Sequence, residues 1–197
     1  MGEEREIPLF PLGTVLFPGG RLPLRIFETR YMDMAKASLR DKSPFGICLI
    51  AEGAEVGLPA VPHETGTLAR IVQWDMPQFG VLEVMVEGGQ CFDIVDRRVE
   101  PSRLQRARVT VRPAPAAEPV PERYARLTDM LRAIAGESGG HLPPPHDFDN
   151  LHWVAYRLSE RMPLPMLVRQ QLLELRESAS RIEMVYRLLQ QQGVRGL

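Results

Sequence analysis

Residues 7–13 are Ile7-Pro8-Leu9-Phe10-Pro11-Leu12-Gly13, an apolar run interrupted by prolines and closed by a glycine. Proline fixes φ and limits the hydrogen bonds of a sheet ladder, and Gly13 permits a turn with φ > 0. We therefore expect a short strand over residues 7–10 that ends in a turn, with another strand over residues 14–17.

The chain continues in the same style to about Pro113, as short β-like runs separated by Gly and Pro. The final run alternates, with Ala107, Val109 and Val111 on one face and polar residues on the other, which predicts a half-buried strand. The further candidate strands are residues 45–50, 67–74, 81–87, 92–99 and 106–112.

A single helix is predicted inside this β-rich region. Phe27, Tyr31, Met34 and Ser38 follow a spacing of four, three and four, and Pro44 marks the end of the helix. Many short strands with one early helix favour a twisted antiparallel pseudo-barrel. The fold class is therefore α+β.

A Pro/Ala-rich linker over residues 113–121 separates this region from a helical one. We predict a β domain over residues 1–117 and a helical subdomain over residues 118–197. The expected helices are an amphipathic one ending at Gly136, one from Asp149 or Asn150 to Arg161, and a C-terminal stretch that fits either one helix or two. The apolar stripe of that stretch comprises Val168, Leu172, Leu175, Ala179, Ile182, Tyr186 and Leu189.

Composition excludes several classes of protein. The 197 residues carry a formal net charge of −1, so no overall field attracts nucleic acid or anionic lipid. The acidic N-terminus is not a signal peptide, and no apolar run is long enough to span a membrane. Cys48 and Cys91 lie in apolar segments without CxxC spacing, which favours buried free thiols and a cytoplasmic protein.

Several motifs, in order along the chain, resemble those of the Lon protease N-terminal (substrate-binding) domain family. The opening block continues with Leu16-Phe17-Pro18-Gly19 and Leu22-Pro23-Leu24-Arg25-Ile26-Phe27-Glu28-Thr29-Arg30-Tyr31. Gly66-Thr67-Leu68-Ala69-Arg70-Ile71 is similar to the family's Gly-Thr-x-Ala-x-Ile strand, and Gln170-Gln171-Leu172-Leu173-Glu174 resembles its helical part. One departure is Cys91, where the family usually has arginine.

The resemblance implies a PUA-like β domain followed by a helical bundle, and a function in capturing unfolded or damaged polypeptides. In full-length Lon proteases this region serves an ATPase and a Ser-Lys peptidase. The chain contains no Gly-Lys dipeptide and therefore no Walker A loop. We expect a stand-alone, non-enzymatic recognition module with no cofactor, no metal and no membrane, and with a possible protease or ATPase partner.

The candidate peptide-binding residues are Trp74, Met76 and Phe79, in the connection between two predicted strands. Turns are usually polar, and apolar side chains exposed there often mark a binding surface. The alternative is that these residues fold back over the end of the barrel.

A second hypothesis is an RNA-binding PUA-like module that uses Arg106, Arg108 and Arg112. Stacking aromatics are missing between the arginines of this stretch, and neighbouring Asp and Glu residues dilute its charge, so a solvated strand face is favoured.

A third hypothesis is a small hydrolase or metal site. Gly136-Glu137-Ser138-Gly139-Gly140 matches the G-x-S-x-G pattern, but a helix precedes it where the motif needs a strand. His141, His146 and His152 lie close in sequence, without the spacing of a helical metal-binding pair. We favour a surface loop for both.

Overall fold

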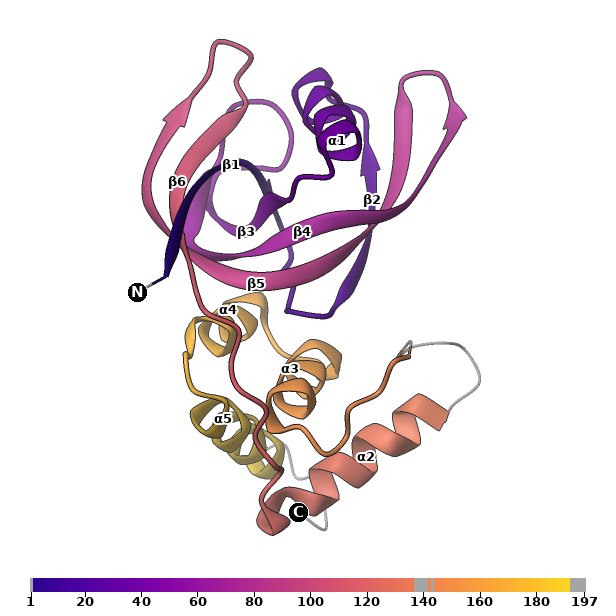
Figure 1. The fold of residues 1–197 in the computed structure, drawn as a ribbon, viewed down its shortest axis with the longest axis vertical. Helices are drawn as coiled ribbons and strands as arrows, with labels where there is room; N and C mark the ends of the chain where they lie inside the picture. The colour runs from indigo at the N-terminus through magenta and orange to yellow at the C-terminus, as the bar shows by residue number, and fades with distance from the viewer. Residues whose placement is uncertain (1, 137–141, 143, 192–197) are drawn as a thin grey trace. The chain divides into compact units, whose positions relative to one another are not determined.

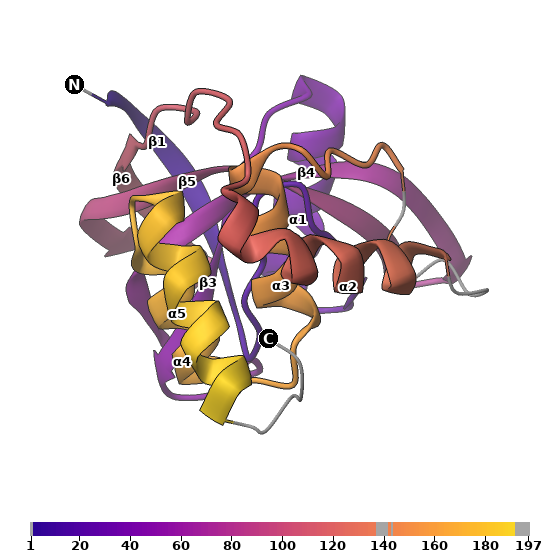
Figure 2. The ribbon, with the colours of Figure 1, turned by 90° about the horizontal axis from the view of Figure 1, so that it is seen from below.

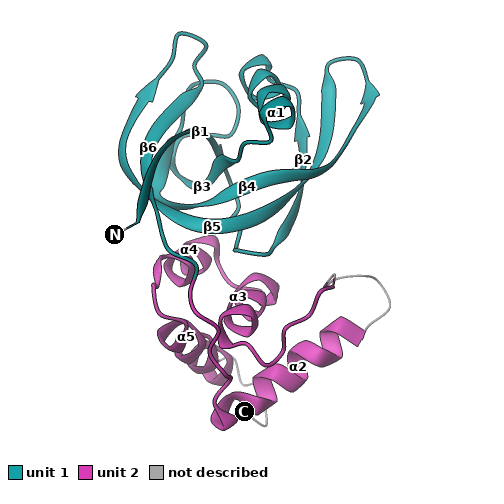
Figure 3. Ribbon diagram, in the orientation of Figure 1, with its two compact units in different colours: residues 1–114 teal, residues 115–197 magenta. Residues whose placement is uncertain are grey.

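The computed structural model describes residues 2–136, 142 and 144–191. It divides the chain into two compact units, Met1–Ala114 and Pro115–Leu197 (Figures 1 and 3). The first unit is built from strands and one helix, and the second from helices.

The first unit contains a six-stranded sheet in the order β2-β5-β4-β3-β1-β6, and a further pairing between β5 and β6 bends it into a near-ring (Figure 1). Its strands are β1 (Glu3–Leu12), β2 (Arg21–Ile26), β3 (Phe45–Glu52), β4 (Val61–Gln78), β5 (Val81–Val99) and β6 (Gln105–Val111). This confirms the predicted α+β class. The expectation of a purely antiparallel barrel needs one correction, because β1 and β3 pair in parallel. Such a pair needs a long crossover, which here contains β2 and the helix α1.

Helix α1 (Thr29–Asp41) covers the core of this unit. Tyr31, Met34 and Ala35 are buried against apolar side chains of the sheet, and the rings of Phe10 and Tyr31 stack with centroids 4.1 Å apart. In β6 the predicted alternation is confirmed, since Ala107, Val109 and Val111 are buried. The predicted helical stripe was wrong at its first position: Phe27 precedes the helix and is exposed.

Two strand predictions were wrong in instructive ways. Residues 14–17 form no strand, although Val15, Leu16 and Phe17 are buried as the chain crosses the barrel. The two runs predicted at residues 81–87 and 92–99 are one strand, β5, because Gly88 and Gly89 continue the extended backbone between them. A side chain at Gly88 would meet the carbonyl oxygen of Phe17 at 2.3 Å, so only glycine fits this crossing point.

The second unit contains a short 3-10 turn, η1 (Glu122–Tyr124), and helices α2 (Ala125–Gly136), α3 (Leu151–Arg161), α4 (Met166–Glu174) and α5 (Ser178–Gln191). Helix α3 packs against α2, α4 and α5 (Figure 2). It begins after Asn150, whose side chain accepts a hydrogen bond from the His152 N–H.

The C-terminal stretch is two helices, with a break before Ser178. Arg181 is buried at this break, where its Nε donates to the Leu172 carbonyl at 2.8 Å and its guanidinium lies over the Tyr156 ring at 4.1 Å. The end of α4 is thereby capped by a side chain of α5. Of the predicted stripe, Leu172, Ile182 and Leu189 are buried, whereas Ala179 is exposed, since the break shifts the buried position to Ser178.

Among the described residues, no helix combines the length and the apolar character that crossing a membrane requires.

Candidate functional site

The most unusual surface of the first unit is a β-hairpin formed by β4 and β5. Strand β3 pairs with β4 only as far as Ala69, so residues 70–78 of β4 continue beyond it, paired only with β5. The strands turn at Phe79 and Gly80, and Gly80 has the positive φ (82°) that a tight turn favours. We call residues 70–87 the hairpin arm. Strand β2 pairs along its β5 side (Figure 1).

The three candidate peptide-binding residues all lie on the hairpin arm. Trp74 and Met76 are in β4, and Phe79 is at the turn, so the segment predicted as a connection is mostly strand. The side chains do not fold back over the barrel: Trp74 is 58% exposed, Met76 43% and Phe79 103%. Val72, on the same strand, is half exposed as well. Large apolar side chains left in contact with water indicate an interaction surface.

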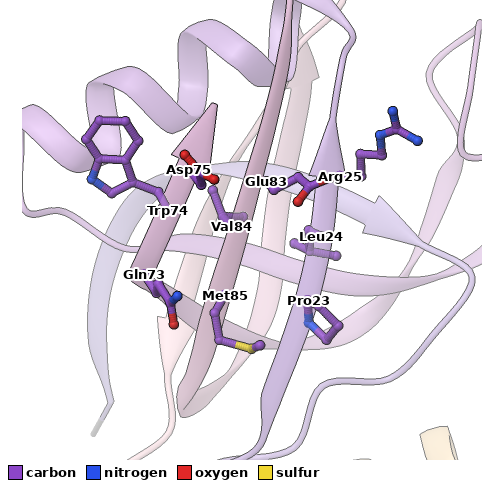
Figure 4. Close-up of a pocket in the computed structure, with 9 residues that line it drawn as sticks. All are labelled: Pro23, Leu24, Arg25, Gln73, Trp74, Asp75, Glu83, Val84 and Met85. Atoms are coloured by element: carbon purple, nitrogen blue, oxygen red, sulfur yellow. The ribbon is translucent and has the colours of Figure 1, made fainter. Parts of the chain in front are cut away.

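A shallow cavity of about 490 Å³ opens beside them (Figure 4). Strands β2, β4 and β5 lie side by side there, and Figure 4 shows Trp74 extending sideways from β4, away from β5. Its lining is apolar at Leu24, Val84 and Met85 and carries charges at Arg25, Asp75 and Glu83. The lining residues are Pro23, Leu24, Arg25, Gln73, Trp74, Asp75, Glu83, Val84 and Met85.

Sequence reasoning missed the contribution of β2 to this surface. A usable signal was present, because Leu22, Leu24 and Ile26 alternate with polar or small residues as a half-buried strand requires. Pro23 obscured it, although proline is acceptable on a strand at the edge of a sheet. The four-three-four spacing that starts at Phe27 also drew residues near this strand into the predicted helix.

The arginine-rich strands at the other end of the sheet are internally paired. Arg106 contacts Glu100 at 2.7 Å, and Arg108 lies 3.6 Å from Glu4. Arg112 is largely buried and contacts Asp93 at 2.6 Å. We call residues 93–112 the arginine arm. Its arginines are close together, as the sequence indicated, but the charges of the three candidate arginines are matched by carboxylates of the same unit, which weakens a phosphate-binding surface.

Arg98 and Glu6 make a two-pronged contact on the same arm, with both nitrogen–oxygen distances at 2.7 Å. These hydrogen bonds from Arg98 hold the pKa of the Glu6 carboxyl below its ordinary value.

The remaining sequence candidates give no site. Ser138 and His141 lie outside the described residues. The ring of His146 contacts the Leu142 carbonyl at 2.8 Å, and His152 contacts Ser178 and the Ala116 carbonyl. No group of three or more His, Cys, Asp or Glu side chains is arranged to hold a metal within the part of the chain that the structure describes.

Both cysteines are buried free thiols, as predicted. Burial raises the pKa of the Cys48 thiol well above its ordinary value, so it stays protonated and inert. Cys91, at the position where the related motif has arginine, is buried in β5.

Comparison with known proteins places this architecture in a family. Residues 6–191 match the model of the ATP-dependent protease La (LON) substrate-binding domain. Among solved structures, the chain is similar to the Lon N-terminal domain protein from Xanthomonas campestris, with 30% identity, a TM-score of 0.79, and coverage of 92% of this chain and 97% of that one.

The N-terminal domain of the Lon protease of the Mycobacterium avium complex shares the fold, with 18% identity, a TM-score of 0.66, and coverage of 98% of this chain and 100% of that one. The comparison with curated proteins gave no match. The matched region takes up nearly all of the 197 residues, which hold no ATPase or peptidase domain. The chain belongs to the Lon substrate-binding domain family.

Proposed function

We propose that the protein is a non-enzymatic recognition module that binds exposed apolar segments of unfolded polypeptides through the hairpin arm. The observation that carries the proposal is the exposure of Trp74, Met76 and Phe79 on one projecting hairpin. Trp is strongly enriched among the residues that dominate binding energy, and Met adapts to varied partners.

Family membership supports the same function, because the matching family is described by its substrate-binding role. The cavity beside Trp74 adds apolar surface from Leu24 and Met85, next to the exposed side chains. A module that captures many sequences needs such adaptable apolar contacts rather than a deep, specific pocket.

The test is the affinity for a permanently unfolded, fluorescently labelled polypeptide, measured by fluorescence anisotropy. Substituting Trp74, Met76 and Phe79 together by Ser should weaken binding at least about thirtyfold, since truncating an interface anchor costs about 2 kcal/mol or more.

Val95 and Val99 supply the matched control. They are exposed apolar residues on the arginine arm, 48% and 54% accessible, so changing both to Ser removes apolar surface elsewhere on the same sheet. Binding should survive in this control. Equal affinity of the hairpin triple variant and the wild type would refute the proposal.

A further inference from the structure

The hairpin arm carries an unpaired strand edge. Residues 70–78 of β4 pair with β5 on one side, while the β3 pairing ends at Ala69 on the other. Apart from the half-buried Ile71, every residue from Arg70 to Gln78 is exposed, so solvent reaches most of this edge. A strand edge of this kind presents free backbone N–H and C=O groups to any extended chain.

The side chains along this edge alternate between the two faces of the sheet, and each forms a row with its partners on β5 and β2. Trp74 lies opposite Val84 in the β4–β5 register, and Val84 lies opposite Leu24 in the β2–β5 register, which makes an apolar row across three strands. The neighbouring row is Asp75, Glu83 and Arg25. Figure 4 shows Trp74 extending past the edge of β4, where the side chain of an added strand would lie.

Next to the turn, the edge has no backbone N–H available for an added strand. The Met76 N–H donates to the Asp75 carboxylate at 2.8 Å, and Pro77 has no N–H. The edge available for pairing is therefore residues 70–75, which contain a register shift between Ile71 and Gln73 and could be spanned by an added segment of about six residues.

The charges at the turn end of this edge favour a basic residue beside Asp75, whereas at the other end Arg70 already lies opposite Glu87. Asp75 and Glu83 lie directly opposite each other, and like charges in that position destabilise a strand pair. Arg25 is in register with Glu83, but its side chain points away from that carboxylate (Figure 4). A cationic side chain on an added strand would relieve this repulsion.

We propose that the module binds its polypeptides by strand addition to residues 70–75 of β4, and that it selects extended apolar segments that carry a basic residue beside Asp75. The apolar side chains lie beside Trp74, and a Lys or Arg lies beside Asp75. This inference rests on the proposed function and specifies how the same surface recognises its substrate.

The test uses a labelled peptide of about ten residues with alternating valine and lysine, together with two derivatives N-methylated at alternate amides. An added strand pairs along only one of its own edges. One methylated derivative should therefore lose roughly tenfold or more in affinity, from several lost hydrogen bonds, while the other binds like the parent peptide. Equal binding of both derivatives would overturn strand addition.

The charge preference has its own comparison. The parent peptide should bind more tightly than its valine/glutamate counterpart, and Asp75→Lys should reverse that order. An unchanged order in Asp75→Lys would overturn the assignment of Asp75.

Two further results separate this inference from the proposed function. If the hairpin triple variant no longer binds the peptide but both methylated derivatives bind the wild type equally, the apolar surface is confirmed as the binding site and strand addition is refuted. If no peptide binds and sedimentation shows a dimer that Trp74→Ser dissociates, the edge pairs with a second copy and the inference is overturned.

Discussion

The hairpin arm and the arginine arm are opposite ends of one sheet, and they differ in whether their exposed side chains have partners within the protein. On the arginine arm, Arg106, Arg108 and Arg112 each have a carboxylate within 4 Å. On the hairpin arm, Trp74, Met76 and Phe79 are left in solvent. The difference supports the proposed binding surface on the hairpin arm: matched charges contribute little to binding a partner, whereas covering apolar surface that lies in water is favourable in free energy.

The largest predicted effect is at Gly88, which lies in strand β5 between the two arms. Gly88→Ala should destabilise the β unit by about 3 kcal/mol or more, because the new Cβ would press against a backbone oxygen that cannot move freely. Gly89→Ala is the adjacent control, since its Cβ would find ordinary contacts at 3.4 Å and beyond. Urea unfolding of both variants gives the comparison, and equal midpoints would contradict the packing described here.

Charge pairing on the arginine arm gives the next largest effect. Arg112→Met leaves Asp93 partly buried without its ion pair, and should cost about 2 kcal/mol in unfolding free energy. Arg108→Met should cost nothing measurable, because its pair with Glu4 is exposed and longer. Should both variants prove equally stable, the burial of Arg112 would have no structural role.

The arginine arm was the easier of the two arms to predict from sequence. Ala107, Val109 and Val111 alternate without interruption, and a period of two fixes both the strand and its buried face. The hairpin arm was harder, because Asp75, Pro77 and Gln78 indicate a connection. The sequence left open whether its apolar side chains are exposed or fold back over the barrel, because the answer depends on β3 ending its pairing with β4 at Ala69, a non-local property of the sheet.

A smaller effect is expected from pH. The pKa of Glu6 is lowered, so its pairing with Arg98 stabilises the folded state above the ordinary carboxyl pKa and ceases to do so as pH falls through the lowered pKa. Glu6→Gln should therefore be slightly less stable than the wild type at neutral pH and equal to it in acid. Thermal unfolding across that range checks the sign, and a gap that widened in acid would contradict it.

No effect at all is predicted for RNA. Because Arg106, Arg108 and Arg112 are already paired with carboxylates, a labelled single-stranded RNA should show no binding that falls steeply with salt, even at low ionic strength. Recovery of such binding, abolished by changing Arg106 and Arg108 to Ala, would move the function from the hairpin arm to the arginine arm.

Hydrogen–deuterium exchange tests both arms in one measurement. Amide exchange is followed in the protein alone and with saturating unfolded polypeptide. We predict that exchange slows in residues 70–75, at the unpaired edge of β4, while residues 105–111 of β6 are unchanged. Slowed exchange confined to the arginine arm, or no change on the hairpin, would contradict the assignment of the hairpin as the binding surface.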